Sequence, residues 1–294
     1  CDAHYRLGVR LARPTRPERM MATRLRIMFE PASWLLWLWI ALLLAMVVAP
    51  ELITTVPPNE IRPTERLQPP GPDHLLGTDE FGRSLFSRIV YGGRLTILVS
   101  FASIALSAVI GIPLGTLAGY FGGVFDSIVM RIQDALLALP GVLLALLMVA
   151  TFGASFWVLV TSIAVVFVPR FARLQRGTVL LLRERVFVEA SRALGAPTGR
   201  ILLRHVLPNS LGPLLVQGSL GLAVAVLIEA GLSYLGLGIQ PPDATWGVML
   251  KASQTYVRQA PHYVVLPGLF LFVTILVFNL LGDRLRSALD PKRS

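Results

Sequence analysis

The residues that could do chemistry gather in one arginine-rich segment, residues 170–208, which holds eight of the 27 Lys and Arg residues. Good helix formers run from residue 185 to 194, Gly195 has the place of a left-handed cap, and Pro197 stops continuation. We expect Thr198 to cap a second short helix that runs toward Pro208. A short helix held between two turns projects rigidly, so the segment predicts a surface that binds another protein.

The expected helix at 185–194 combines apolar and basic side chains in a way that suits docking. Its carboxylate, Glu189, lies near the helix start, where the helix dipole favours a negative charge. Its arginines could meet acidic residues around a groove on a partner, while its apolar side chains fill that groove. These apolar residues are Val186, Phe187, Val188, Ala190 and Leu194.

Outside this segment, candidates for chemistry are few. Glu229 is the one acidic residue close to the interior of an apolar run, and an ionisable group within a membrane is a functional candidate. The alternative is an interfacial position near the end of that run. No glycine loop ends in Gly-Lys-Ser/Thr, no Ser/His/Asp arrangement is evident, and a single Cys excludes a disulfide scaffold. The histidines show no metal-ligand spacing: His4, His74, His205 and His262.

The elements that position these residues are membrane helices. The chain has 294 residues, of which 54% are hydrophobic and 15% charged, against roughly 25% charged in a soluble domain. A span needs about 20 apolar residues. The stretches that lack charges and histidine over such a length are 31–50, 95–125, 135–169, 206–228 and 263–282. Residues 135–169 would make a helix of about 52 Å, too long for one span. Small residues at 151–155 divide it into spans at about 132–152 and 155–173, which makes six.

The distribution of basic residues indicates the orientation. If both termini are cytoplasmic, 20 of the 27 Lys and Arg residues fall in the inside segments 1–33, 120–132, 170–208 and 283–294. Cytoplasmic loops normally hold this excess. The net charge of +10 is therefore explained by orientation, and we expect no nucleic-acid partner.

The docking segment also resembles a known signature. The pattern Glu189-Ala190-Ser191-x3-Gly195-x9-His205-x-Leu207-Pro208 resembles the loop of inner-membrane permease subunits of ATP-binding-cassette importers. The common form has Ala in place of Ser191 and Ile in place of His205. The His before Val-Leu-Pro-Asn is usual in the di- and oligopeptide subgroup. Further marks of that subgroup are Gly77-Thr-Asp-x-x-Gly-Arg83, Ala118-Gly-Tyr-Phe-Gly-Gly123, Leu235-Gly-Leu-Gly-Ile-Gln-Pro-Pro242, Trp246-Gly247, Asn279-Leu-Leu-Gly-Asp-x-Leu-Arg286 and Asp290-Pro291.

The resemblance covers about residues 74–294 and implies an all-α, polytopic protein with the type I importer permease fold, similar to the C-type permease of a dipeptide/oligopeptide transporter in the bacterial inner membrane. It implies a second homologous permease subunit, two cytoplasmic ATPase domains that bind ATP and Mg, and an external substrate-binding protein. No cofactor is expected in this chain. The ATPase-coupling residues would be Glu189, Ala190, Ser191, Arg192, Gly195, His205, Leu207 and Pro208, with Glu229 as a pathway candidate.

The expected organisation follows from these spans. Residues 1–32 form a basic cytoplasmic tail, and residues 1–20 are a candidate extension because Met20, Met21 and Met28 offer other starts. Residues 33–56 form the first span, which we interpret as an uncleaved anchor rather than a signal peptide. Residues 57–94 form an outer loop with an interfacial amphipathic helix after Gly82. Residues 95–294 form a five-helix core with the cytoplasmic coupling loop 170–208.

Other interpretations remain open at this point. Relatives with this signature also move nickel, glutathione or other small solutes. An intramembrane enzyme would need paired catalytic groups within spans, where only Glu229 is found. A secondary transporter working alone would carry internal repeats and buried ion-coupling groups, and neither is evident.

The spacing of Gly115 and Gly119 suits close helix packing within the chain more than a contact between subunits.

Overall fold

The computed structural model describes residues 34–289, and these residues form helices with no strand among them. The predicted all-α class is confirmed. The basic tail at 1–32, the candidate starts Met20, Met21 and Met28, and the motif Asp290-Pro291 lie outside the described residues. The helices are α2 (Trp34–Val48), α3 (Leu85–Phe121), α4 (Gly123–Leu137), α5 (Gly141–Phe152), α6 (Phe156–Leu182), α7 (Val186–Ala193), α8 (Thr198–Ile201), α9 (Leu207–Tyr234), α10 (Trp246–Ser253) and α11 (Pro261–Leu289), with a π-helical turn (η4) at Leu202–Val206 and short 3₁₀ turns at Pro50–Leu52 (η2), Pro63–Glu65 (η3) and Gln254–Tyr256 (η5).

Long apolar helices dominate the described part of the chain. Four are long and apolar enough to cross a membrane: α3, α6, the run Thr198–Tyr234 that contains α9, and α11. A fifth span results if α4 and α5 are counted together, and α2 is apolar but has only 15 residues. The count of six spans therefore stays a prediction.

The break expected inside the 35-residue apolar stretch is present. Helix α5 ends at Phe152 and α6 begins at Phe156, where the Ser155 hydroxyl accepts from the Val158 N–H at 3.3 Å. The span expected at about 132–152 is not one continuous helix, because α4 and α5 meet at an angle of 87°. Pro140 explains the bend, since it has no N–H to donate and disfavours helical backbone at Leu139. Helix α6 also continues to Leu182, beyond the expected end at 173.

The amphipathic stretch after Gly82 does not form a helix of its own. It supplies the first turns of α3, whose N-terminus is capped by the Ser84 hydroxyl on the Ser87 N–H at 3.4 Å. Its apolar residues Leu85, Ile89 and Val90 are buried against other helices. Packing onto α10 and α11 thus extends the second span outward beyond residue 95.

Helices α3 and α6 pack with almost no space between their backbones. A Cβ on Gly115 would lie 2.2 Å from the Ala172 carbonyl oxygen, and one on Gly111 would lie 2.7 Å from that of Val168. Glycine at these positions therefore sets the distance between the two helices. The glycine spacing serves packing within the chain, as expected.

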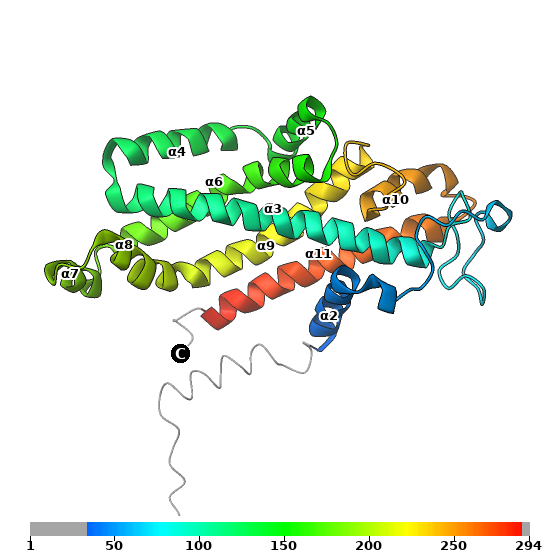
Figure 1. Cartoon of the computed structure of the whole chain (residues 1–294), viewed down its shortest axis with the longest axis horizontal. Coiled ribbons are helices and arrows are strands. Elements are labelled where there is room, and N and C mark those ends of the chain that lie inside the picture. The colour runs from blue at the N-terminus through cyan, green and yellow to red at the C-terminus, as the bar shows by residue number, and fades with distance from the viewer. Residues whose placement is uncertain (1–33, 290–294) are drawn as a thin grey trace, which may run out of the picture.

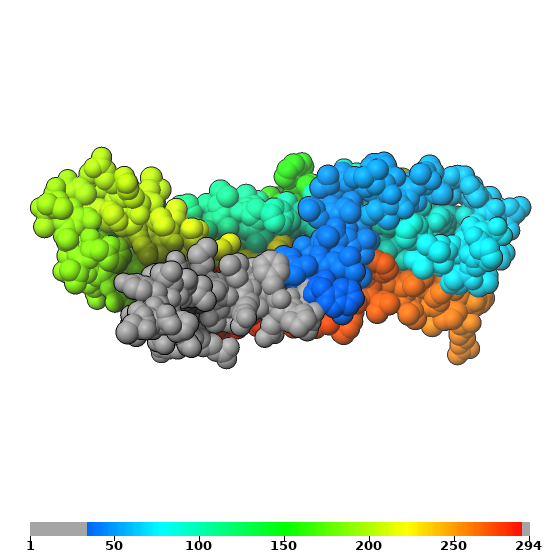
Figure 2. Space-filling view, turned by 90° about the horizontal axis from the view of Figure 1, so that it is seen from below, coloured from blue at the N-terminus to red at the C-terminus, as the bar shows by residue number. Residues whose placement is uncertain are grey.

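The molecule is elongated, with two distinct ends. Figure 1 shows α7 and α8 at one end of the long axis, and the segment between α2 and α3 together with α10 at the other. Figure 2 shows the same separation from a second direction. The fold thus places the docking segment and the outer segment at opposite ends of the helices.

Candidate functional site

The docking segment forms a short helix closed at both ends. Helix α7 begins after Arg185 and is followed by Leu194 and by Gly195, whose φ is 76°. The Gly195 N–H donates to the Arg192 carbonyl at 2.9 Å, and the Ala196 N–H donates to the Ser191 carbonyl at 3.1 Å. This pair of bonds is the Schellman arrangement, which needs a left-handed residue and so favours glycine. The predicted role of Gly195 as the cap is confirmed.

One side of α7 faces the protein and the other is open. Val188 is fully buried and packs with Val179, Ile201, Leu202 and Val206. The expectation that Val188 contacts a partner is therefore wrong, because helical periodicity turns it inward. The other apolar residues of the segment stay outside, with Val186 80%, Leu194 88% and Phe187 41% exposed, and Ala190 also exposed.

The second turn of the segment differs in detail from the expectation. Pro197 precedes α8 in an extended conformation and Thr198 is the first residue of the helix, with no side-chain cap. Thr198 is therefore not the cap. After α8 the chain passes through the π-helical turn that contains His205, and Leu207 and Pro208 open α9.

Ser191 and His205, the two departures from the common family pattern, lie beside each other. The Ser191 hydroxyl is 3.5 Å from His205 Nε2 and donates to the Phe187 carbonyl at 2.8 Å. The His205 ring centroid lies 6.3 Å from that of Phe187. Of the remaining coupling candidates, Glu189 stands exposed in the first turn of α7. His205 thus connects α7 to the π-helical turn before α9. The spacing in the sequence alone did not indicate that His205 would lie next to Ser191.

Two arginines connect the docking segment to the end of α3, a link that no sequence motif signalled. The Arg183 guanidinium donates to the Gly119 carbonyl at 3.1 Å. The Arg192 guanidinium reaches the Tyr120 hydroxyl at 3.5 Å and lies 5.7 Å from the centre of its ring. Helix α7 therefore contacts the ends of three spans: α3 through Arg192, α6 through Val179, and α9 through His205 in the π-helical turn before it.

Glu229 lies in α9, fully buried. Its Oε1 accepts from the Ser233 hydroxyl at 2.8 Å, and Thr96 of α3 and Thr245 at the start of α10 approach the carboxyl group. Its Oε2 has no hydrogen-bond partner among the described residues. The side chain thus lies between three helices and reaches no surface of this chain.

The motif Gly77-Thr-Asp-x-x-Gly-Arg83 folds the outer segment. Asp79 is buried, and it accepts from the backbone N–H of Arg83 at 2.9 Å and from Arg83 Nε at 2.6 Å. Arg88 of α3 lies 3.4 Å from the same carboxylate. The Tyr263 hydroxyl of α11 donates to Glu80 at 2.6 Å. The motif therefore fastens the outer segment to the first turns of α3 and α11.

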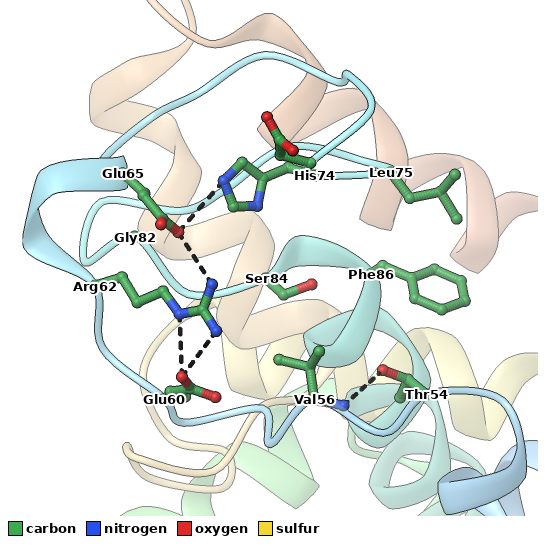
Figure 3. Close-up of a pocket in the computed structure, with 11 residues that line it drawn as sticks. Thr54, Val56, Glu60, Arg62, Glu65, His74, Leu75, Gly82, Ser84 and Phe86 are labelled. Atoms are coloured by element: carbon green, nitrogen blue, oxygen red, sulfur yellow. Dashed lines mark hydrogen bonds and ion pairs between the residues drawn. The ribbon is translucent and has the colours of Figure 1, made fainter.

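A polar pocket of about 170 Å³ opens on this outer segment (Figure 3). Arg62 pairs there with Glu60 at 2.9 Å and Glu65 at 3.4 Å, and His74 lies 3.3 Å from Glu65. The two carboxylates, Glu60 first, raise the pKa of Arg62 above its usual value. These pairs are exposed, so water screens the attraction between their charges, and they shape the surface of the outer end while adding little to the stability of the fold.

Known proteins share the sequence features of this chain. Residues 111–294 match the family described as the inner membrane component of binding-protein-dependent transport systems. The dipeptide transport system permease protein DppC of Alkalihalophilus pseudofirmus is 45% identical over 250 residues, which cover 85% of this chain and 82% of that protein. The glutathione transport system permease protein GsiD of Pectobacterium atrosepticum is 44% identical over 223 residues, covering 76% and 74%.

A solved structure supports the same fold. A chain of the MetNI methionine ABC transporter, in an inward-facing conformation, superposes with a TM-score of 0.56 at 21% identity, covering 69% of this chain and 96% of that one. With the family match and several apolar helices long enough to span a membrane, the fold is that of a type I ABC importer permease. The chain therefore belongs to the family of inner-membrane components of binding-protein-dependent transport systems, as a multi-pass permease subunit of an ABC importer.

Proposed function

We propose that this permease subunit imports di- or oligopeptides, driven by ATP that partner subunits hydrolyse. Relatives named for dipeptide, D,D-dipeptide and di/tripeptide transport, at 40–45% identity, support the substrate class. Relatives named for glutathione transport, at 40–44% identity, favour glutathione as the second candidate, and nickel or another small solute is a further alternative. An intramembrane enzyme has no comparable support.

The observation that carries the proposed mechanism is the two-sided character of α7. Val188 anchors the helix inside the protein, while Val186 and Leu194 are 80% and 88% exposed. An exposed apolar patch of this kind is typical of a protein interface. We assign it to a cleft on a cytoplasmic ATPase subunit, with the exposed side chains of Arg185 and Arg200 at the rim.

In this mechanism each partner has a separate task. Two cytoplasmic ATPase domains bind ATP and Mg, and this chain holds no cofactor. A second homologous permease completes the pathway, and an external binding protein delivers the substrate. Closure of the ATPase domains moves the docked α7, and the spans rock between inward and outward access.

The roles proposed for the coupling residues follow from their places. Gly195 closes α7, and Glu189 lies in its first turn with a favourable helix dipole. Ser191 and His205 join α7 to the base of α9. Arg192 reaches α3. The remaining members of the proposed coupling set are Ala190, Leu207 and Pro208.

The proposed orientation has six spans with both termini in the cytoplasm. It rests on the excess of basic residues in segments assigned to the inside. Under this orientation the end with α7 and α8 is cytoplasmic, and the end with residues 49–84 and α10 faces outward.

The position of Glu229 does not suit a residue that lines the pathway. Its carboxyl group is fully buried among α3, α9 and the start of α10, so it cannot touch a passing substrate without rearrangement of these helices. We propose that it positions α10 at the outer end. A contact with substrate would require Glu229 to become exposed in another state.

The function can be tested with this chain together with the proteins encoded by the genes next to its own. The permease pair, the ATPase subunits and the binding protein are reconstituted in vesicles, and ATP-dependent uptake of labelled dipeptide is measured in competition with glutathione and Ni²⁺. Uptake displaced by unlabelled peptides is the expected result. Displacement only by glutathione or Ni²⁺ would transfer the assignment to those solutes.

A further inference from the structure

The cytoplasmic end of α3 is held by the docking segment at two points. Arg183, which follows α6, donates to the Gly119 carbonyl at 3.1 Å. Arg192, in the last turn of α7, lies with its guanidinium 3.5 Å from the Tyr120 hydroxyl and 5.7 Å from the ring centre. The two arginines come from opposite sides of the turn between α6 and α7, and their targets are consecutive residues.

The chemistry of these contacts suits the end of a helix. The last carbonyls of α3 lack intrahelical partners and carry partial negative charge, so cations next to them are favourable. Gly122 ends α3 with φ 67°, and its N–H bonds back to Ala118 at 3.0 Å. A guanidinium over an aromatic face adds a cation–π attraction. Both arginines thus contact the last turn of α3 directly.

Helix α3 packs directly on α6 from Gly111 to Gly119, so these turns cannot move separately from α6. The backbones touch at Gly111 and Gly115, and a Cβ on Gly119 would lie 2.9 Å from the Arg176 carbonyl oxygen. Interhelical contact of this closeness transmits displacement as a rigid body. A displacement of α7 that pulls the end of α3 would therefore move the α3–α6 pair together.

We propose that Tyr120 is a positioning residue: through Arg192 it makes the end of α3 follow α7, with Arg183 on Gly119 as the second attachment. This inference rests on the proposed coupling to ATPase subunits. It gives a role to the Ala118-Gly-Tyr-Phe-Gly-Gly123 motif, since the tyrosine ring and hydroxyl both face the docking segment's arginine. The neighbouring Phe121, 62% exposed, has no such contact with Arg192.

The test follows the end of α3 directly. In a Cys1→Ser background, a fluorophore is placed on Leu117→Cys, and its change on adding ATP is recorded for the assembled complex in nanodiscs. The variants are Arg192→Gln, Tyr120→Phe, the double variant, and Arg192→Lys, which keeps the cation. Arg131→Gln, an exposed arginine of α4, is the control for loss of one positive charge. ATP hydrolysed per peptide imported is measured in parallel.

The expected result is a reduced fluorescence response in Arg192→Gln and a rise of about twofold to fivefold in ATP hydrolysed per peptide, the scale of one exposed cation–π contact. Tyr120→Phe should give a smaller effect, because the ring remains. The double variant should be no worse than Arg192→Gln, and Arg192→Lys and Arg131→Gln should behave as wild type. ATPase subunits should copurify with every variant.

The inference would be overturned if the fluorescence of the wild-type probe did not change on adding ATP, or if the response in Arg192→Gln equalled that of the wild type. It would also be overturned if the variants lost ATPase binding, because these residues would then be part of the docking surface. Failure of the proposed substrate class has a different signature. The probe would still respond to ATP and lose its response in Arg192→Gln, while no peptide uptake is seen in wild type.

Discussion

The Ser191 hydroxyl lies 3.5 Å from His205 Nε2, so the docking helix meets the base of a membrane span at the two positions where the sequence departs from the common pattern of its family. The contact is long for a hydrogen bond, and its net contribution is therefore at the low end of about 0.5–1.5 kcal/mol. This contact joins α7 to the π-helical turn before α9. π-Helical turns are frequent at functional sites.

Ser191→Ala should be mild. It restores the residue of the common pattern and removes a weak contact, so transport should fall less than about threefold. His205→Ala should cost more, because the ring packs near Phe187 as well as Ser191. Uptake rates of both single variants and the double variant measure the coupling between the two sites. If the single effects simply multiplied, the two side chains would act independently.

Gly195→Val should disrupt the end of α7. The left-handed backbone at φ 76° costs a non-glycine residue about 1–2 kcal/mol, more for a β-branched one. Gly199→Val in α8 is the matched control, since neither glycine has an atom within 4 Å of its added Cβ and only Gly195 has a positive φ. Copurification of the ATPase subunits is the measurement. Equal losses in both variants would mean that the local backbone conformation is not the cause.

Gly115→Ala should destabilise the whole bundle, because the added Cβ would lie 2.2 Å from the Ala172 carbonyl oxygen. Overpacking of this kind costs about 1–3 kcal/mol. Gly177→Ala in α6 is the control, since its Cβ meets nothing within 4 Å. Thermal unfolding in detergent should show a lower Tm for the first variant only. An unchanged Tm for Gly115→Ala would contradict the close packing of α3 on α6.

The ion pair between Asp126 of α4 and Arg176 of α6 should matter more than its neighbour. Arg176 donates to both carboxylate oxygens, at 2.5 and 2.6 Å, and the pair is partly buried. Asp126→Asn should lower stability by about 1 kcal/mol. Asp134→Asn breaks the pair with Arg173, whose side chains are about half exposed, and should have little effect. Denaturation midpoints compare the two, and a reversed order would contradict this assignment.

Several features of the fold were predictable from the sequence. Small residues at 151–155 divide the long apolar stretch, and Gly195 and Pro197 delimit the docking helix. These features follow from local preferences of the backbone. The bend before Gly141 had a local signal too, in Pro140, although hydropathy alone suggested a single span at about 132–152.

Other features depend on contacts between distant residues and could not be read from one sequence. Val188 turns inward because Ile201 and Val206 cover it. Helix α6 extends to Leu182, where Arg176 pairs with Asp126 of α4 and the following Arg183 donates to the Gly119 carbonyl of α3. Glu229 is buried by α3 and α10 rather than placed at an open surface. Hydropathy measures preference for an apolar environment and does not distinguish lipid, pathway and protein interior.

The orientation has a direct test by labelling. In the Cys1→Ser background, Thr198→Cys should react only with a reagent supplied from the cytoplasmic side, and Asn59→Cys only with one supplied from outside, because the two positions lie at opposite ends of the molecule (Figure 1). Labelling of both positions from one side would contradict the six-span topology.

The exposed apolar residues at α7 are expected to bind the ATPase directly. Leu194 directly follows α7 and Leu52 lies in the 3₁₀ turn after α2, and both are 88% exposed, so they form a matched pair. The decisive measurement is the affinity of the ATPase subunits for Leu194→Asp and Leu52→Asp permease complexes. Leu194→Asp should lower the affinity at least about tenfold, or 1.4 kcal/mol, and Leu52→Asp should keep wild-type affinity. Wild-type affinity for Leu194→Asp, or an equal loss in both, would contradict this direct binding.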